Sequence, residues 1–161
     1  MIVRSGGGGR RAIDPGRATR IRSAAVPLGL GSWVLALVLA ASAGNIAVTW
    51  VPQAPLLGMT IGTHGALAIV TVLFGVNVIA LRSRVSPGWL DIGVATRIRR
   101  NLLVLGNFGL LLACLGWLTL GVAAGETAIS TPVLVVEFLL PAVLVAYTGL
   151  VAVLVSRWTR I

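Results

Sequence analysis

The chain contains 161 residues, of which 57% are hydrophobic and only 11% are charged, and its mean hydropathy is +1.00. Soluble domains carry about 25% charged residues, so this composition excludes an ordinary soluble globular domain. It predicts an all-α integral membrane protein, because an apolar chain of this length has room for four spans of about 20 residues and for no separate soluble domain.

The formal net charge is +9, and all 13 basic residues are arginines. A surplus of this size would suit nucleic acid if the arginines formed a patch with interleaved aromatic side chains. They instead flank apolar segments, which is typical of topology signals and lipid head-group contacts. The predicted partners are the lipid bilayer and other membrane subunits or further copies of this chain, without nucleic acid. The chain uses arginine and no lysine, and it is rich in Ala, Val, Leu and Gly. This composition is compatible with a GC-rich prokaryotic genome.

Residues 1–26 are expected to form a flexible, basic N-terminal segment on the cytoplasmic side. Its first part contains the run Ser5–Gly9, which offers almost nothing to bury. Helical structure is expected to start near Asp14 and Pro15, because Asp is a favoured N-cap and Pro is favoured at the first helical position.

Four apolar segments are each long enough to cross about 30 Å of hydrocarbon. The expected spans are residues 27–48, 59–81, 101–122 and 132–156, which together make a four-helix transmembrane domain at 27–156. Residues 157–161 are expected to form a cytoplasmic C-terminus.

The connections between these spans are short. Residues Trp50–Pro55 contain two prolines and predict a tight turn, and Ala123–Thr127 predicts a short loop. The segment 86–100 could form an interfacial helix or a cytoplasmic extension of the third span.

The arginines are distributed very unevenly among these connections. The N-terminal segment holds six, the connection between the second and third spans holds five, the C-terminus holds two, and the remaining two connections hold none. Under the positive-inside rule this predicts a multi-pass cell-membrane protein with both termini in the cytoplasm. The arginines expected to set the topology and contact lipid head groups are Arg20, Arg22, Arg82, Arg84, Arg97, Arg99, Arg100, Arg157 and Arg160.

The first span also has a competing interpretation as a secretory signal peptide. Arg20–Arg22, the following apolar run and Ala41–Ala43 resemble the three regions of such a signal. We favour a retained span, because the apolar run continues past Ala43 and exceeds the usual length of a signal-peptide core.

The segment Ala18–Arg22, with the sequence Ala-Thr-Arg-Ile-Arg, recurs unchanged as Ala95–Arg99 just before the third span. The same offset along the chain produces further matches. It pairs Gly29 with Gly106, Gly44 with Gly121, Pro55 with Pro132, and Thr71 with Thr148. The pattern predicts a tandem duplication of a two-helix hairpin, with both copies in the same membrane orientation. Apolar sequences of low diversity also match by chance, and the two basic flanks could have arisen independently.

Glu137 is the acidic residue that falls within a predicted span, where a charge is costly and often marks a functional site. His64, the only histidine, is expected at nearly the same depth. Thr60 shares the helical face of His64, and Asn45 lies near the same end of the first span. These four residues form the candidate polar site. It could be a proton relay, an ion site, or a head-group or quinone contact, but a hydrogen bond that holds the bundle together is favoured.

Other kinds of site find no support in the sequence. Haem ligation by two histidines is excluded by the single histidine, and Met59 would point to another side of the helix than His64. No zinc-ligand set, nucleophile elbow or phosphate-binding loop is present. We therefore expect no enzyme activity and no cofactor. Cys114, the only cysteine, is expected to be a small buried hydrophobic residue.

Pairs of small residues at a spacing of four often mark places where membrane helices approach closely. Pairs with this spacing, expected here to indicate close packing, are Ala40 and Gly44, Gly58 and Gly62, and Gly121 and Gly125.

Taken together, these features favour a non-catalytic accessory or structural subunit of a membrane complex, for example a respiratory one. The alternative is a small oligomeric transporter or channel whose coupling site contains Glu137 and His64.

Overall fold

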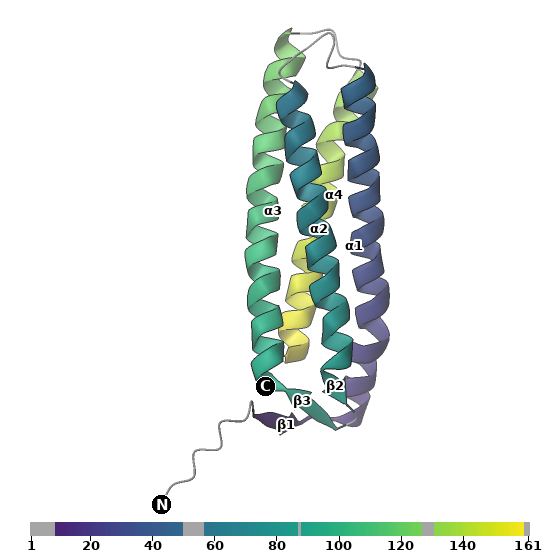
Figure 1. Ribbon diagram of the computed structural model, residues 1–161, viewed down its shortest axis with the longest axis vertical. Helices are drawn as coiled ribbons and strands as arrows, with labels where there is room; N and C mark the ends of the chain where they lie inside the picture. The colour runs from purple at the N-terminus through teal and green to yellow at the C-terminus, as the bar shows by residue number, and fades with distance from the viewer. Residues whose placement is uncertain (1–8, 50–56, 87, 127–130, 160–161) are drawn as a thin grey trace, which may run out of the picture.

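The computed structural model describes residues 9–49, 57–86, 88–126 and 131–159. Four long helices run antiparallel along one axis (Figure 1): α1 (Pro15–Thr49), α2 (Leu57–Ser83), α3 (Ile92–Glu126) and α4 (Thr131–Thr159). Three short strands lie at one end: β1 (Arg10–Ala12), β2 (Val85–Ser86) and β3 (Trp89–Asp91). Helices account for 91% of the described residues. The predicted helical class is therefore confirmed, with a small sheet added.

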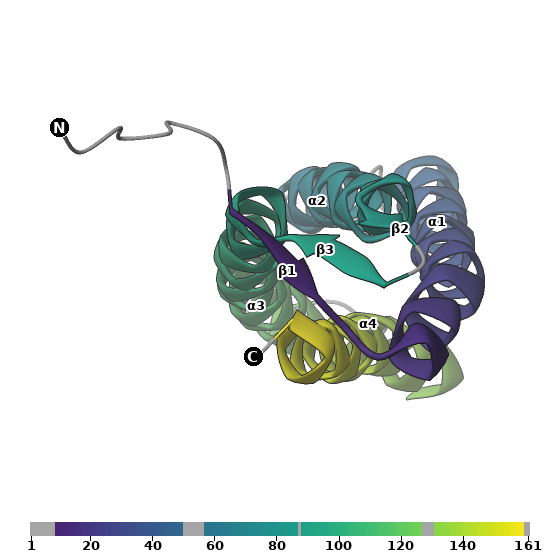
Figure 2. The same cartoon turned by 90° about the horizontal axis from the view of Figure 1, so that it is seen from below.

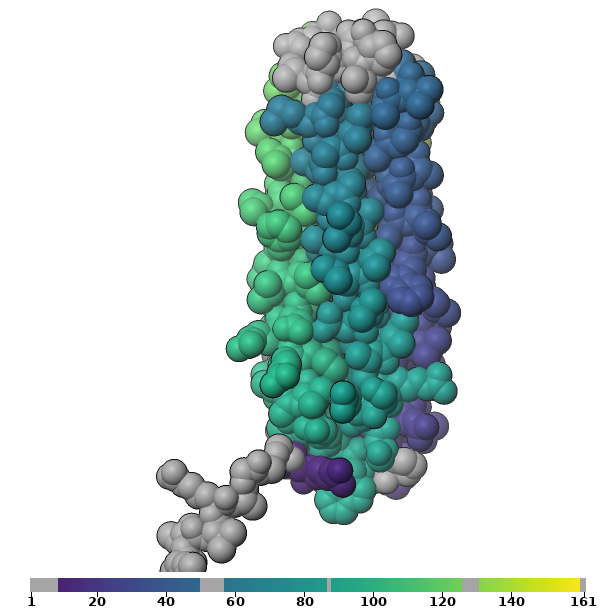
Figure 3. All heavy atoms as spheres, in the orientation of Figure 1, coloured from purple at the N-terminus to yellow at the C-terminus, as the bar shows by residue number. Residues whose placement is uncertain are grey.

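All four helices are long and apolar enough to cross a membrane, as predicted. The shortest, α2, has 27 residues, which corresponds to about 40 Å at 1.5 Å per residue, against about 30 Å of hydrocarbon. Large apolar side chains point outward from the bundle: Leu37, Ile69 and Leu118 are 71%, 64% and 65% exposed. On the face formed by α1, α2 and α3, side chains close the spaces between the ribbons (Figure 3).

Two helices begin well before the apolar spans expected from the sequence. The start near Asp14 and Pro15 is confirmed, so α1 begins at Pro15, several turns before the expected span at 27. Helix α3 begins at Ile92. Of the two alternatives for the segment 86–100, the extension of the third span is therefore correct for residues 92–100.

The loop expected at Ala123–Thr127 is wrong over its first four residues, because α3 continues through Glu126. Alanine is the strongest helix former, so two alanines in succession extend the helix beyond the apolar span. Thr127 and the turn expected at Trp50–Pro55 lie outside the described residues.

An aspartate caps the first turn of both α1 and α3. The backbone N–H of Arg17 donates to Asp14 Oδ2 at 2.9 Å, and that of Val94 donates to Asp91 Oδ1 at 3.1 Å. Each bond satisfies a backbone donor that has no partner within the helix. The two helices have the same length of 35 residues.

The three strands form an antiparallel sheet in the order β1-β3-β2, which lies across the end of the bundle (Figure 2). Gly88 lies between β2 and β3 with φ of 84°, a conformation that favours glycine. The N–H of Ile13 donates to Gly88 O at 2.9 Å and extends the contact toward α1. Part of the N-terminal segment expected to be flexible is therefore paired, because the connection between α2 and α3 offers it a strand edge.

One face of the sheet covers the hydrophobic core at this end. Ile13, Val85 and Leu90 are 9%, 3% and 0% exposed, and they pack in one cluster with Phe74 and Ile98 of the helices. Trp89, on the opposite face of β3, is 53% exposed. The sheet thus works as an apolar plug at the end of the bundle.

Helices α1 and α2 touch backbone to backbone at Gly29 and Gly75. A Cβ atom at Gly75 would lie 2.7 Å from Gly29 O and 2.8 Å from the indole of Trp33. The indole Nε1 donates to Val72 O at 3.2 Å and adds a polar link at the same crossing.

The expected close packing at the small-residue pairs is wrong. At the five glycines of those pairs, an added Cβ would meet no atom of the described residues within 4 Å: Gly44, Gly58, Gly62, Gly121 and Gly125. Cys114 also differs from expectation, because it is exposed on the surface of α3. Spacing alone identifies neither the helical face nor the partner helix, so it could not separate these positions from Gly29 and Gly75.

Candidate functional site

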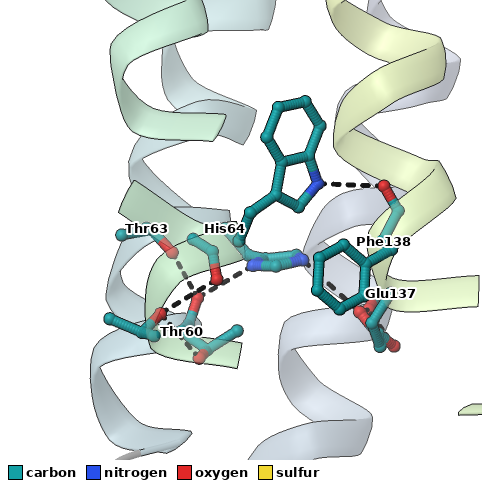
Figure 4. Close-up of polar contacts among 9 residues, drawn as sticks. Thr60, Thr63, His64, Glu137 and Phe138 are labelled. Atoms are coloured by element: carbon teal, nitrogen blue, oxygen red, sulfur yellow. Dashed lines mark hydrogen bonds and ion pairs between the residues drawn. The ribbon is translucent and has the colours of Figure 1, made fainter. Parts of the chain in front are cut away.

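A cluster of polar side chains lies inside the bundle, at some distance from the sheet. Glu137 of α4 is 4% exposed and His64 of α2 is 2% exposed. His64 Nε2 lies 3.4 Å from Glu137 Oε2. Figure 4 shows the imidazole between Thr60 on one side and Glu137 on the other. The structure therefore brings together the two residues that the sequence placed at one depth.

Ser42 of α1 supplies a third group to this cluster. Its hydroxyl lies 2.7 Å from Glu137 Oε1 and 2.5 Å from Oε2, so it donates to the carboxylate from a different helix than the one that carries His64. Sequence reasoning missed Ser42, which entered only through Ala41–Ala43 as part of the alternative signal-peptide interpretation. Depth was the available signal, because Ser42 lies near the expected end of the first span at 48.

The orientation of the imidazole is fixed by a backbone group. His64 Nδ1 lies 2.8 Å from the carbonyl oxygen of Thr60, one turn earlier on α2. A carbonyl oxygen can only accept, so Nδ1 must carry a hydrogen. Nε2 then faces Glu137, and it has no hydrogen-bond partner among the described residues.

This arrangement constrains the number of protons on the pair. With Nδ1 protonated, Nε2 of a neutral imidazole is an acceptor, and an ionised carboxylate is also an acceptor. Two acceptors that face each other at 3.4 Å inside an apolar bundle would repel. One additional proton, on either Nε2 or the Glu137 carboxyl, removes the repulsion and makes the pair neutral overall. Without it a single negative charge would be buried, which is costly.

Helix α3 joins the cluster through hydroxyl groups. The side-chain oxygens of Thr60 and Thr119 lie 3.0 Å apart, and the hydroxyl of Thr63 donates to Thr60 O at 2.8 Å. A Cβ on Gly116 of α3 would lie 3.0 Å from Thr63 Oγ1, so α3 approaches closely here. All four helices therefore contribute to one layer of polar contacts.

A hydrogen bond between α3 and α4 lies beside this layer. The indole Nε1 of Trp117 donates to Phe138 O at 3.0 Å. The space next to the imidazole, bordered by Leu67, Ala113 and Pro141 among others, has no room for a water molecule. On this side the imidazole therefore has no space for water, whereas Ser42 is partly exposed.

The other candidate residues have different positions. Thr60 belongs to the cluster through both its hydroxyl and its carbonyl. Asn45 does not, because it is exposed and its Oδ1 accepts a hydrogen bond from Thr49 Oγ1 at 3.4 Å. Among the described residues, no group of three or more His, Cys, Asp or Glu side chains is arranged to hold a metal ion.

The arginines that the sequence assigned to topology lie on the helix ends that meet the sheet, apart from Arg160, which is outside the described residues. Most of their side chains are exposed, while Arg99 is half-buried. At this end the Arg17 guanidinium also donates to Arg157 O at 2.7 Å, which links α1 to α4. The arginine-rich end of the bundle is thus the end closed by the sheet.

The function of this site has to be argued from its own geometry. No family model, no curated protein and no solved structure matches the chain.

Proposed function

We propose that the four helices cross the plasma membrane, with both termini and the arginine-rich end in the cytoplasm. Helix length and the outward-facing apolar side chains support membrane insertion. The positive-inside rule supports the orientation. It is tested by cysteine labelling in a Cys114→Ala background. A membrane-impermeant maleimide added to intact cells is expected to label Thr49→Cys and to leave Ser83→Cys unlabelled until the cells are opened. The reverse pattern would overturn the orientation.

Within that membrane, we propose a non-catalytic structural or accessory role in a larger membrane complex. The observation that carries it is the polar layer, in which Glu137 of α4 contacts Ser42 of α1 and His64 of α2, while Thr60 of α2 pairs with Thr119 of α3. His64 and Glu137 are buried inside the bundle, so the outer helical surfaces remain for contact with partners.

Affinity purification from a mild detergent tests this role. A stoichiometric membrane partner, identified by mass spectrometry, is expected to accompany the wild-type chain. Migration as a single chain in its own micelle, at native expression level and in several detergents, would contradict an accessory role.

The second candidate is an oligomeric transporter or channel that couples its substrate to a proton. It is favoured by one observation, the proton that His64 and Glu137 must share. Flux into liposomes separates the two candidates. A transporter would move protons in the wild type and lose this flux in Glu137→Gln and His64→Ala, whereas the structural role predicts no flux from any of the three proteins.

We also propose that the chain arose by tandem duplication of a two-helix hairpin. Helices α1 and α3 begin at Pro15 and Ile92 and end at Thr49 and Glu126, and both pairs have the offset of the repeated Ala-Thr-Arg-Ile-Arg segment. Their capping residues, Asp14 and Asp91, have the same offset. Eight of the nine buried positions of α1 correspond to buried positions of α3 at this offset.

The second helices of the two hairpins also correspond. The hydroxyl of Thr71 donates to Leu67 O at 2.7 Å, and that of Thr148 donates to Leu144 O at 2.9 Å, so the repeat offset relates both donors and both acceptors. An experimental structure is expected to superpose the α1–α2 hairpin on α3–α4 by rotation about the membrane normal. A superposition that requires an axis in the membrane plane would contradict duplication in parallel orientation.

A further inference from the structure

A groove separates α3 from α4 in the half of the bundle nearest the arginine-rich end. It has a volume of about 730 Å³, and its lining includes Gly106 and Leu110 of α3 and Gly149 and Ala152 of α4. The inner wall is thus formed mainly by small and apolar residues. In a membrane such a groove cannot remain empty, because unfilled apolar walls lose their packing contacts.

The first hairpin has no such groove at the corresponding place. Gly29 and Gly75, which pack backbone to backbone, correspond at the repeat offset to Gly106 and Ala152, which line the groove. A Cβ on Gly106 would meet nothing within 4 Å. The second hairpin is therefore open where the first is closed, and it offers a long cavity in place of a helix contact.

The end of the groove carries positive charge. Arg99 of α3 and Arg157 of α4 both line it, and no acidic side chain does so among the described residues that form it. Both arginines are placed where the apolar part of a helix ends, at the level of lipid head groups. Asn107 and Ser156, also in the lining, provide further polar groups. Apolar walls that lead to two guanidinium groups match an acyl chain attached to a phosphate.

We propose that the α3–α4 groove binds one anionic phospholipid from the leaflet at the arginine-rich end. The acyl chain fills the space beside Gly106 and Ala152, and the phosphate lies between Arg99 and Arg157. This inference rests on the proposed membrane insertion.

Native mass spectrometry of the purified protein, with phosphatidylglycerol and phosphatidylcholine of identical acyl chains added in turn, tests the site. One phosphatidylglycerol is expected to remain bound in preference to phosphatidylcholine. In Arg99→Gln/Arg157→Gln its affinity is expected to fall about 30-fold, since each arginine near the head groups contributes about fivefold. The matched control is Arg97→Gln/Arg100→Gln, which removes the same charge from exposed positions outside the groove.

Variants that fill the groove provide an independent test. Gly149→Leu and Gly106→Leu are expected to displace the lipid, whereas Gly121→Leu, on α3 outside the groove and also without neighbours, is expected to retain it. Equal retention of both lipids, equal loss in both arginine pairs, or loss of a co-purifying subunit instead of lipid in Gly106→Leu would each overturn the proposal. If cysteine labelling supports membrane insertion while lipid selectivity is absent, only the lipid site fails.

Discussion

The carboxyl group of Glu137 is held from two sides, by the Ser42 hydroxyl and by the imidazole of His64. Interhelical hydrogen bonds of side chains in membranes contribute about 0.6 kcal/mol on average. An unpaired buried polar group has a larger effect, about 1–3 kcal/mol. Substitutions in the cluster should therefore lower the free energy of unfolding by different amounts, depending on which polar group each one leaves without a partner.

Ser42→Ala is expected to lower the free energy of unfolding by about 0.6 kcal/mol. Glu137→Leu is expected to lower it by about 1–3 kcal/mol, because it leaves His64 Nε2 facing an apolar side chain. Glu137→Gln should stay close to the wild type, since an amide can accept from Ser42 and donate to His64. Thermal unfolding in detergent measures these differences, with the exposed Asn45→Ala as control. A Glu137→Leu protein as stable as the wild type would contradict the structural role.

At this scale three residues of the cluster, Glu137, His64 and Thr60, could be predicted from the sequence, whereas Ser42 could not. Glu137 and His64 were recognisable because ionisable groups are rare in apolar spans. Asn45 was named because it lies near the same end of the first span, but its side chain on α1 is exposed. Ser42 and Asn45 are three positions apart and point in directions about 60° apart around the helix, and the sequence does not reveal which of them reaches Glu137.

At the level of helices, α1 and α2 make a close backbone contact through Gly29 and Gly75. Gly75→Leu is expected to destabilise the protein by about 1–3 kcal/mol, because the added side chain meets the backbone of α1 and the Trp33 indole. Gly62→Leu on the same helix is the matched control, since nothing lies within 4 Å of that position. Equal thermal stability of the two variants would argue against the close crossing.

The two aspartate caps provide a second prediction about helices. Asp14→Ala and Asp91→Ala are each expected to lower the free energy of unfolding by about 1 kcal/mol, because each removes the acceptor for a backbone N–H in the first turn. Asp→Asn at the same positions should preserve most of the stability, as asparagine is an equally good N-cap. Chemical or thermal unfolding of the four variants measures the effect. An effect at only one site would show that the caps are not equivalent.

Helix number, approximate placement and the start of α1 were predictable, whereas both ends of α3 were not. Apolar runs identify the membrane-crossing part of a helix, but α1 and α3 continue into polar sequence that is helical because of its caps and its alanines. The Asp14 cap was visible in the sequence because Pro15 follows it. The equivalent cap at Asp91 was not singled out, because Ile92 stands where the first copy has proline.

For the whole molecule, the sheet is the feature that the sequence did not indicate. Strands of two or three residues are too short to show alternation, and β1 comes from a segment with the composition of a tail. Their pairing depends on the helices, which bring residues 9–13 beside the connection between α2 and α3. Such contacts between distant segments cannot be inferred from local composition.

The plug can be tested by comparing two neighbours on β3. Leu90→Asp places a charge against the core and is expected to separate the sheet from the bundle, whereas Trp89→Asp on the exposed face should leave it in place. Hydrogen–deuterium exchange of the amides of residues 10–13 measures this separation. Protection is expected to be lost in Leu90→Asp alone. Equal protection in both variants would contradict the role of the sheet as a plug.

The central claim is that the His64 imidazole is buried inside the bundle, with an Nδ1–H bonded to Thr60 O and with Nε2 turned toward Glu137. Because His64 is the only histidine, nitrogen-15 NMR of histidine-labelled protein in a membrane reports on this imidazole alone. The account predicts that Nδ1 carries a hydrogen, bound to Thr60 O, and that this hydrogen exchanges slowly with deuterium oxide. An unprotonated Nδ1, or rapid exchange at Nδ1, would contradict it.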